Sequence, residues 1–204
     1  MRTSPLAVAC VAFAASVASV ASVSCGSAGG QPPASAPSPL LSRALPDFRR
    51  PAVGGGEEVE TARLRGRVVL VDFFAENCIP CARSLPAVEA LHRAMPELSV
   101  VGVSEDEDAA GARRMVERFG LTFPVVHDAQ HVLAGRYRVV AMPATFVADA
   151  SGVVRWRGDQ AHDEGELRAV IEGARLLGHA PDRRARRADA VDPARVEGEG
   201  QIEV

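Results

Sequence analysis

The chain has 204 residues, a formal net charge of -3 and four cysteines. Its near-neutral charge gives no basis for nucleic-acid binding, and we expect no nucleic-acid partner. The length fits one ordinary domain with additional terminal segments, and no internal repeat is visible at the periods typical of solenoids or propellers. A hydrophobic fraction of 47% is ample for a packed core, although part of it lies in the N-terminal segment.

Residues 1–25 have the pattern of an export signal. Arg2 precedes an uncharged run, residues 6–23, that is rich in Ala, Val and Ser, and small residues follow. The alternative is an uncleaved membrane anchor, but the Ser and Ala content makes the run weakly hydrophobic. We therefore expect an extracytoplasmic protein on the periplasmic side of the membrane.

Cys25 resembles the lipidated cysteine of bacterial lipoprotein signals. Ser24 provides the small residue that precedes such a cysteine, whereas Ser22 stands where those signals usually have Leu. Lipidation of Cys25 with anchoring in the membrane, and simple cleavage of the signal, both stay open.

The composition then divides the chain into three further parts. Residues 26–43 are rich in Gly, Pro, Ala and Ser, which is typical of a flexible linker. Residues 44–179 carry the apolar patterning of a globular domain. Residues 180–204 are rich in Arg and then acidic, with almost no large apolar residues, and are predicted to be a disordered tail.

Within the domain, apolar strand runs alternate with segments of helical periodicity. Residues 68–74 are apolar on both faces, as in a central strand. The later elements are predicted in the order helix 80–95, strand 98–103, helix 108–119, a connection with a short helix over 124–137, strand 145–148, strand 153–156 and helix 164–177. This βαβ and ββα order predicts an α/β fold with a central mixed sheet flanked by helices.

The sequence Cys78-Ile79-Pro80-Cys81 directly follows the central strand and opens the next helix. Cysteines three apart at a helix start have their Cα atoms roughly 5–6 Å apart, within disulfide reach. The helix N-terminus favours a thiolate on Cys78, so Cys78 is predicted to attack and Cys81, one turn inside, to resolve. Pro80 tolerates the first turn but removes one N–H donor.

Half of a zinc site is the alternative interpretation of this cysteine pair. A structural zinc needs four ligands, and Cys10 and Cys25 lie in the predicted signal. His127 and His131 are four apart, but a turn is predicted beside them. We therefore predict a redox-active dithiol, with no metal and no cofactor.

Asp72 lies near the end of the predicted central strand. Burial would desolvate its carboxylate and raise its pKa. A carboxylate near Cys81 can take the proton of that thiol when the disulfide re-forms. The alternative is an ordinary carboxylate in water at the strand end, which the apolar residues on both sides disfavour.

Asp72, Ala75, Cys78, Pro80 and Cys81 match the active-site region of thioredoxin, in which a strand ending in Asp-Phe-Trp-Ala leads into Cys-Gly-Pro-Cys. The chain is therefore similar to the thioredoxin superfamily. This resemblance implies a thioredoxin-like fold and the activity of a thiol-disulfide oxidoreductase.

The resemblance also implies a substrate surface. The segment of residues 141–145 resembles the family's cis-proline segment, in which Met142 and Pro143 would present backbone groups to an incoming peptide. The residues around the cysteines complete the predicted substrate-binding set of Asn77, Ile79, Pro80, Met142 and Pro143. Asn77 replaces a family tryptophan, so substrate docking is expected to differ.

The stretches 64–71, 100–103 and 119–125 are similar to the extracytoplasmic thioredoxins of the TlpA and ResA type, which are related to redoxins and AhpC/TSA proteins. The resemblance predicts two additions to the thioredoxin-like fold: an N-terminal extension, and a helical insert that residues 108–123 would supply. The TlpA and ResA type also has a Glu near the cysteines that tunes their pKa and moves protons. Counting back from Phe123 places this role on Glu107, although the run of residues 105–108 leaves the choice open.

We therefore predict an exported protein disulfide reductase. It would take electrons from a membrane thiol donor of the DsbD/CcdA type and reduce protein disulfides, either in cytochrome c maturation or in other envelope proteins. A peroxiredoxin-like antioxidant is an alternative, but Ala75 stands where that class needs Thr or Ser. A copper-binding thioredoxin-like module is another, but the cysteine spacing is one residue too short. The direction of electron flow stays open.

Overall fold

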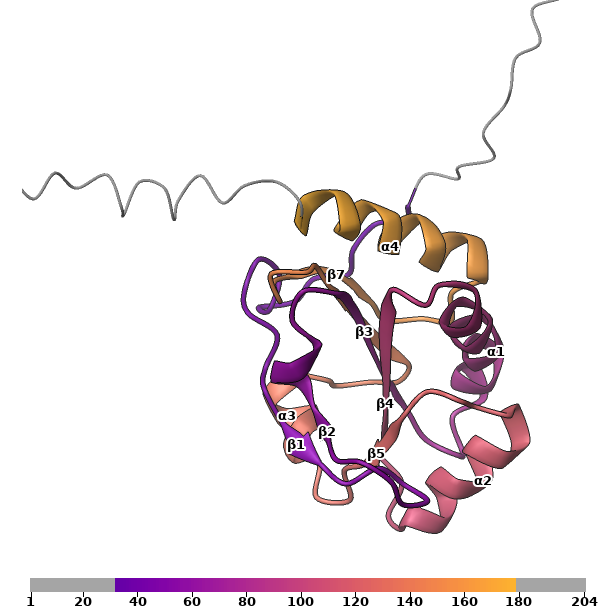
Figure 1. Ribbon diagram of the computed structural model, residues 1–204. Helices are drawn as coiled ribbons and strands as arrows, with labels where there is room; N and C mark the ends of the chain where they lie inside the picture. Colours follow the sequence, from indigo (N-terminus) through magenta and orange to yellow (C-terminus); the bar gives the residue numbers. More distant parts are fainter. Residues whose placement is uncertain (1–31, 179–204) are drawn as a thin grey trace, which may run out of the picture.

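The computed structural model describes residues 32–178 (Figure 1). The predicted signal, Cys25, the beginning of the predicted linker and the predicted tail lie outside the described residues. In chain order the elements are β1 (Arg49–Arg50), β2 (Val59–Glu60), a 3-10 helix (Thr61–Leu64), β3 (Val68–Phe74), α1 (Ile79–Ala94), β4 (Leu98–Ser104), α2 (Ala109–Phe119), β5 (Val125–His127), α3 (Val132–Tyr137), β6 (Ala144–Ala148), β7 (Val154–Gly158) and α4 (Glu164–Gly178).

The main sheet has five strands in the order β5-β4-β3-β6-β7. β3 pairs in parallel with β4 and antiparallel with β6, and β4 pairs in parallel with β5. The predicted mixed sheet is therefore confirmed. The segment predicted as a connection with a short helix contains that helix, α3, and also contributes β5, whose three residues pair with the C-terminal half of β4.

Side chains of β3 alternate between two apolar cores, one on each face of the sheet. Leu70 and Phe74 pack with α1 and α4 on one face, whereas Val71 and Phe73 pack with Tyr137 of α3 and the N-terminal segment on the other. Figure 1 shows α1 and α4 on the face opposite to α3, β1 and β2. Because both faces of the sheet are covered, β3 is buried along its whole length.

Residues 33–45 lie along the outer edge of β7, although their composition suits a flexible spacer. The N–H of Ala36 donates to the carbonyl of Arg157 over 2.8 Å, and the N–H of Ser42 donates to that of Val154 over 2.9 Å. An isolated antiparallel bridge joins Ala44 to the same edge. These contacts cover a strand edge that would otherwise be open to pairing with other chains.

Among residues 32–178, no helix is long and apolar enough to cross a bilayer.

Candidate redox site

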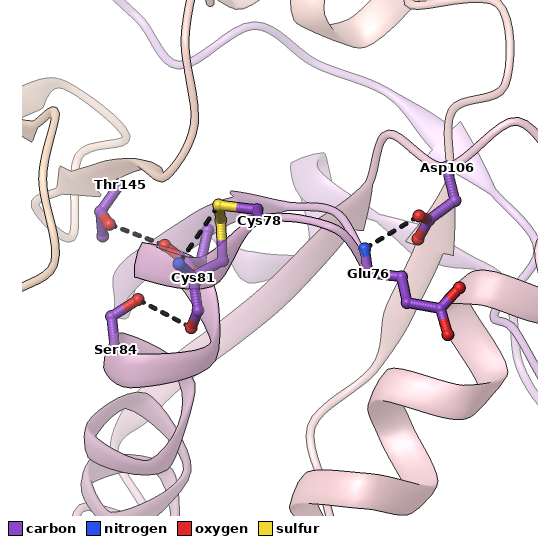
Figure 2. The surroundings of a disulfide bond; sticks show 7 residues. Glu76, Cys78, Cys81, Ser84, Asp106 and Thr145 are labelled. Carbon is purple, nitrogen blue, oxygen red and sulfur yellow. Dashed lines mark hydrogen bonds between the residues drawn. A yellow bond between two sulfur atoms is a disulfide. The ribbon is translucent and has the colours of Figure 1, made fainter.

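The candidate site lies where β3 leads into α1. Cys78 caps α1, and its Sγ accepts a hydrogen bond from the N–H of Cys81 over 3.2 Å. The two cysteines form a disulfide with their Cα atoms 5.2 Å apart (Figure 2). Pro80 occupies the first turn of the helix, where its missing N–H leaves no intrahelical bond unmade.

The two sulfur-bearing residues differ in their access to solvent. Cys81 is fully buried in the core beneath α1, whereas Cys78 is only partly buried and Ile79 beside it is 76% exposed. An incoming thiol or disulfide can therefore approach Cys78 and is shielded from Cys81.

A hollow of about 430 Å³, here called the sulfur hollow, opens beside Cys78. Four of the predicted substrate-binding residues line it, namely Asn77, Ile79, Pro80 and Met142. The fifth, Pro143, follows Met142 through a cis peptide bond. The chain thus brings residues from two distant segments, the α1 start and the β6 start, to one mostly apolar surface next to the disulfide.

Asp72 is fully buried on β3. Its Oδ1 accepts a hydrogen bond from the Thr145 hydroxyl over 2.6 Å, while its Oδ2 has no partner among the described residues. Burial raises the pKa of Asp72 to about 7, and the Thr145 bond only partly opposes this shift.

Strand alternation places Asp72 on the same face of β3 as Leu70 and Phe74, which pack in the core that contains Cys81. In Figure 2 the hydroxyl of Thr145 points toward the first turn of α1, which carries Cys81. The buried carboxyl therefore lies on the face of the sheet that packs against Cys81, and its role as a proton acceptor stays a prediction.

The loop before Cys78 is held from two sides. The N–H of Glu76 donates to Oδ1 of Asp106 over 2.9 Å, and Arg114 of α2 donates to both carboxylate oxygens of Glu76 over 2.6 Å. The hydroxyl of Ser104 in turn donates to the other oxygen of Asp106 over 2.8 Å. The helical insert therefore positions the loop that presents the attacking cysteine, and the Arg114 bond lowers the pKa of Glu76.

Replacing Arg114 with Gln is expected to slow the alkylation of Cys78 several-fold in the reduced protein at neutral pH. The change leaves the Glu76 carboxylate without its counter-charge two residues before Cys78, and a nearby negative charge disfavours a thiolate. The rate of iodoacetamide labelling checks this result. Arg113→Gln is the control, because Arg113 is a neighbouring exposed arginine that lines a different hollow with Arg50. Equal rates in both variants would contradict a role for the Glu76 pair.

The acidic run after β4 contains the predicted Glu107, but a different glutamate of the run is the buried one. Glu107 is exposed and lines a second hollow of about 350 Å³, here called the acidic hollow, together with Asn77 and Glu76. The buried carboxyl in this run is that of Glu105, which is 8% exposed and lines the same hollow. Burial raises the pKa of Glu105 to about 7. The signal in the sequence is its position directly after a buried strand.

Comparisons with known proteins agree with this geometry. The model of the AhpC/TSA family matches residues 41–157. The thiol-disulfide oxidoreductase ResA of Geobacillus kaustophilus is 32% identical over 102 residues, which cover 49% of this chain and 59% of the relative. Protein DipZ of Mycobacterium tuberculosis is 30% identical over 132 residues, which cover 59% of this chain and 19% of DipZ. The chain thus spans about three fifths of the ResA relative and a small part of DipZ.

Solved structures of similar fold include a secreted Mycobacterium tuberculosis disulfide oxidoreductase homologous to Escherichia coli DsbE. It has a TM-score of 0.58 and 23% identity, and the match covers 62% of this chain and 95% of that chain. A thiol-disulfide isomerase from Corynebacterium glutamicum has a TM-score of 0.57 and 22% identity, with coverage of 65% and 96%. These matches confirm the predicted thioredoxin-like fold.

Proposed function

The chain belongs to the AhpC/TSA family, and from this membership we propose that it works as an exported protein disulfide reductase. It is a thioredoxin-superfamily protein of the TlpA/ResA-like type, as the sequence predicted, and its relatives are named thiol-disulfide oxidoreductases. The observation that carries the proposal is the disulfide at the start of α1, with a partly exposed Cys78 and a buried Cys81.

In the proposed reaction the Cys78 thiolate attacks one sulfur of a substrate disulfide. The other substrate sulfur leaves as a thiolate and takes a proton, and a mixed disulfide joins Cys78 to the substrate. Cys81 then gives its proton to Asp72, and its thiolate attacks Sγ of Cys78. The second substrate sulfur leaves as a thiolate and is protonated in turn, so two electrons pass to the substrate and the disulfide in Figure 2 forms.

One hollow and two buried carboxyl groups support roles in this reaction. The sulfur hollow suits an apolar stretch of a protein substrate, because Ile79 and Met142 form much of its wall. Asp72 suits the proton acceptor for Cys81. Glu105, rather than the exposed Glu107, suits the pKa-tuning carboxyl that the ResA-type resemblance implies, since it is the buried glutamate of the acidic hollow.

The finer parts of the proposal concern the cell. An export signal, with or without lipid on Cys25, would place the domain on the periplasmic side of the membrane. A membrane thiol donor of the DsbD/CcdA type would restore the dithiol after each turnover. Disulfides of envelope proteins, including apocytochrome c during cytochrome c maturation, would then be the substrates. The relatives named thiol-disulfide oxidoreductases support the type of reaction, and the cellular setting is inferred from the sequence.

The reduction potential of the cysteine pair tests the direction of the reaction. Equilibration with glutathione or dithiothreitol is expected to give a value at or below about -230 mV, toward the thioredoxin value of about -270 mV. A value above about -150 mV would approach that of the oxidant DsbA and would overturn the assignment as a reductase. Failure of the pair to form a disulfide in solution would overturn redox catalysis altogether.

Direct assays distinguish the proposed reductase from the two alternatives, a peroxiredoxin-like antioxidant and a copper-binding module. A peroxiredoxin would consume peroxide through Cys78, but Ala75 gives no hydroxyl group three residues before it. Within residues 32–178, no group of three or more His, Cys, Asp or Glu side chains is placed to hold a metal ion, so a copper ion would have the two thiolates as its main ligands there. We expect insulin reduction by the dithiol form and no peroxide consumption above that of free thiols.

A further inference from the structure

Glu105 joins the two sides of the candidate site. Its backbone N–H donates to the carbonyl of Phe74 over 2.9 Å, which fixes it beside the end of β3. Its side chain lines the acidic hollow next to Asn77. It also lines a smaller hollow of about 190 Å³, here called the inner hollow, which Met142 borders. Charge on Glu105 is therefore felt on both sides of the loop that carries Cys78.

The Glu105 carboxyl has one well-defined partner and one unsatisfied atom. Nδ1 of His131 lies 2.5 Å from Oε2, and the imidazole is 62% exposed while the Glu105 side chain is 3% exposed. Oε1 is buried and has no hydrogen-bond donor among the described residues. The carboxyl of Asp128 lies against Glu105, and its own Oδ2 accepts the N–H groups of Leu133 and Ala134 over 2.7 and 3.0 Å.

The groups in contact with Glu105 shift its pKa in opposite directions. Burial raises the pKa of Glu105 to about 7, the His131 bond lowers it, and the negative charge of Asp128 raises it. The bond to Glu105 raises the pKa of His131. The remaining charged neighbours are those of the acidic hollow, namely Glu76, Asp106, Glu107, Asp108 and Arg114. Because Glu105 and His131 share a hydrogen bond, the proton on one affects the proton affinity of the other.

We propose that His131 is a positioning residue through which Glu105 exchanges its proton with water, and that Asp128 holds that proton on Oε1. With the proton on Oε1, the O–H of Glu105 donates to Asp128, so the unsatisfied atom gains its partner. When Glu105 gives this proton up to water, the imidazole takes up one from water in exchange and donates from Nδ1 to Oε2. The cluster then keeps one proton, either on the buried carboxyl or on the exposed ring. The consequence for the cysteines rests on the proposed function, but the proton site does not.

The consequence concerns the Cys78 thiolate. A neutral Glu105, or an ionised Glu105 beside a protonated His131, adds little net charge near the two hollows. An ionised Glu105 beside a neutral His131 adds a negative charge that disfavours the thiolate. His131 thereby widens the pH range over which Cys78 stays reactive.

The first experiment follows the Glu105 side-chain carboxyl by ¹³C NMR in the full chain with the disulfide intact, from pH 4 to 9. The wild-type midpoint is expected near pH 7. His131→Asn, which tolerates the left-handed backbone at this residue (φ 53°), is expected to move the midpoint to higher pH, because the imidazole bond that lowers it is lost. His127→Asn is the matched control, since His127 contacts the Asp106 carbonyl instead of Glu105.

Two results would overturn the proposal: a Glu105 midpoint near the ordinary value of about 4.3, or the same midpoint with and without His131. A second variant, Glu105→Gln, keeps the shape of the side chain and is followed through the titration of the His131 ring. Because the carboxylate bond that raises the His131 pKa is lost, the ring should then titrate at lower pH. An unchanged His131 midpoint in that variant would also contradict the proposal.

A further measurement links the cluster to the site. In the reduced protein, the alkylation rate of Cys78 against pH is expected to show an inflection where the cluster loses its one proton, which Glu105→Gln removes and His131→Asn displaces. The NMR titrations need no substrate or turnover, so they hold even if the protein fails to reduce disulfides. A correct titration with no effect on Cys78 would confine the cluster to a proton site without a role in the reaction.

Discussion

Replacing Cys81 with Ala is expected to abolish catalytic turnover while trapping the substrate on Cys78. Cys78 is the partly exposed sulfur at the start of α1, so its attack on a substrate disulfide is preserved. The resolving thiol is absent, and no other cysteine lies among the described residues to replace it. Because Cys81 is fully buried among apolar residues, Ala fits the site without a new polar group.

Intact-mass spectrometry after mixing with a disulfide-bearing peptide checks this result, and a stable one-to-one adduct that dithiothreitol releases is expected. Cys78→Ala is the matched control, since it also loses the intramolecular disulfide but keeps only the buried thiol. It should show neither adduct nor turnover. An adduct on Cys81 in that control would reverse the two roles, and continued turnover of Cys81→Ala would mean that Cys78 works alone.

The central part of this fold follows from local sequence patterns. The apolar run that forms β3 is a strong signal, because a strand buried on both faces is apolar along nearly its whole length. The Cys-x-x-Cys that opens α1 is a second one, because the first turn of a helix has free backbone N–H groups that a capping side chain can satisfy. Asp72 stands out for the same reason, as a single charge within a strand that has no exposed face. These residues are close in sequence, so their arrangement needs no knowledge of the tertiary structure.

Other parts of the site depend on contacts between distant segments. Glu105 and Glu107 are both acidic residues after a strand, and the contact between Glu105 and the distant His131 is not visible in the local sequence. The pairing of β5 with β4 involves three residues, too few for a clear periodicity. Residues 33–45 bind the β7 edge mainly through backbone groups, which leave no mark in the side-chain pattern.

Replacing Asp72 with Asn is expected to stabilise the protein at alkaline pH and to slow the resolving step. The pKa of Asp72 is raised from 3.8 to about 7 in the folded protein, so the folded state binds a proton that the unfolded state has lost. The free energy of unfolding therefore falls as pH rises from about 4 to about 7, and the full cost is present above pH 7. This shift corresponds to about 4 kcal/mol.

Asn cannot ionise, so the pH-dependent cost disappears, although its buried amide costs about 1–3 kcal/mol at every pH where it lacks a partner. The stability of Asp72→Asn relative to the parent should thus rise steadily from pH 4 to pH 7 and then level off. Urea denaturation of the disulfide form at several pH values measures this difference. A flat difference would mean that Asp72 titrates at an ordinary pKa.

Asp149→Asn provides the contrasting control, because Asp149 is equally buried. Burial alone would raise its pKa, but hydrogen bonds from Ser151 and Arg155 outweigh burial and lower it. Asp149→Asn should therefore destabilise the protein at neutral pH, the opposite sign to Asp72→Asn. In the reduced protein, Asp72→Asn should also slow release of a Cys78-bound peptide by about 10²-fold, because Cys81 loses its proton acceptor. A stability gain without this slowing would leave Asp72 a buried acid that takes no part in the exchange.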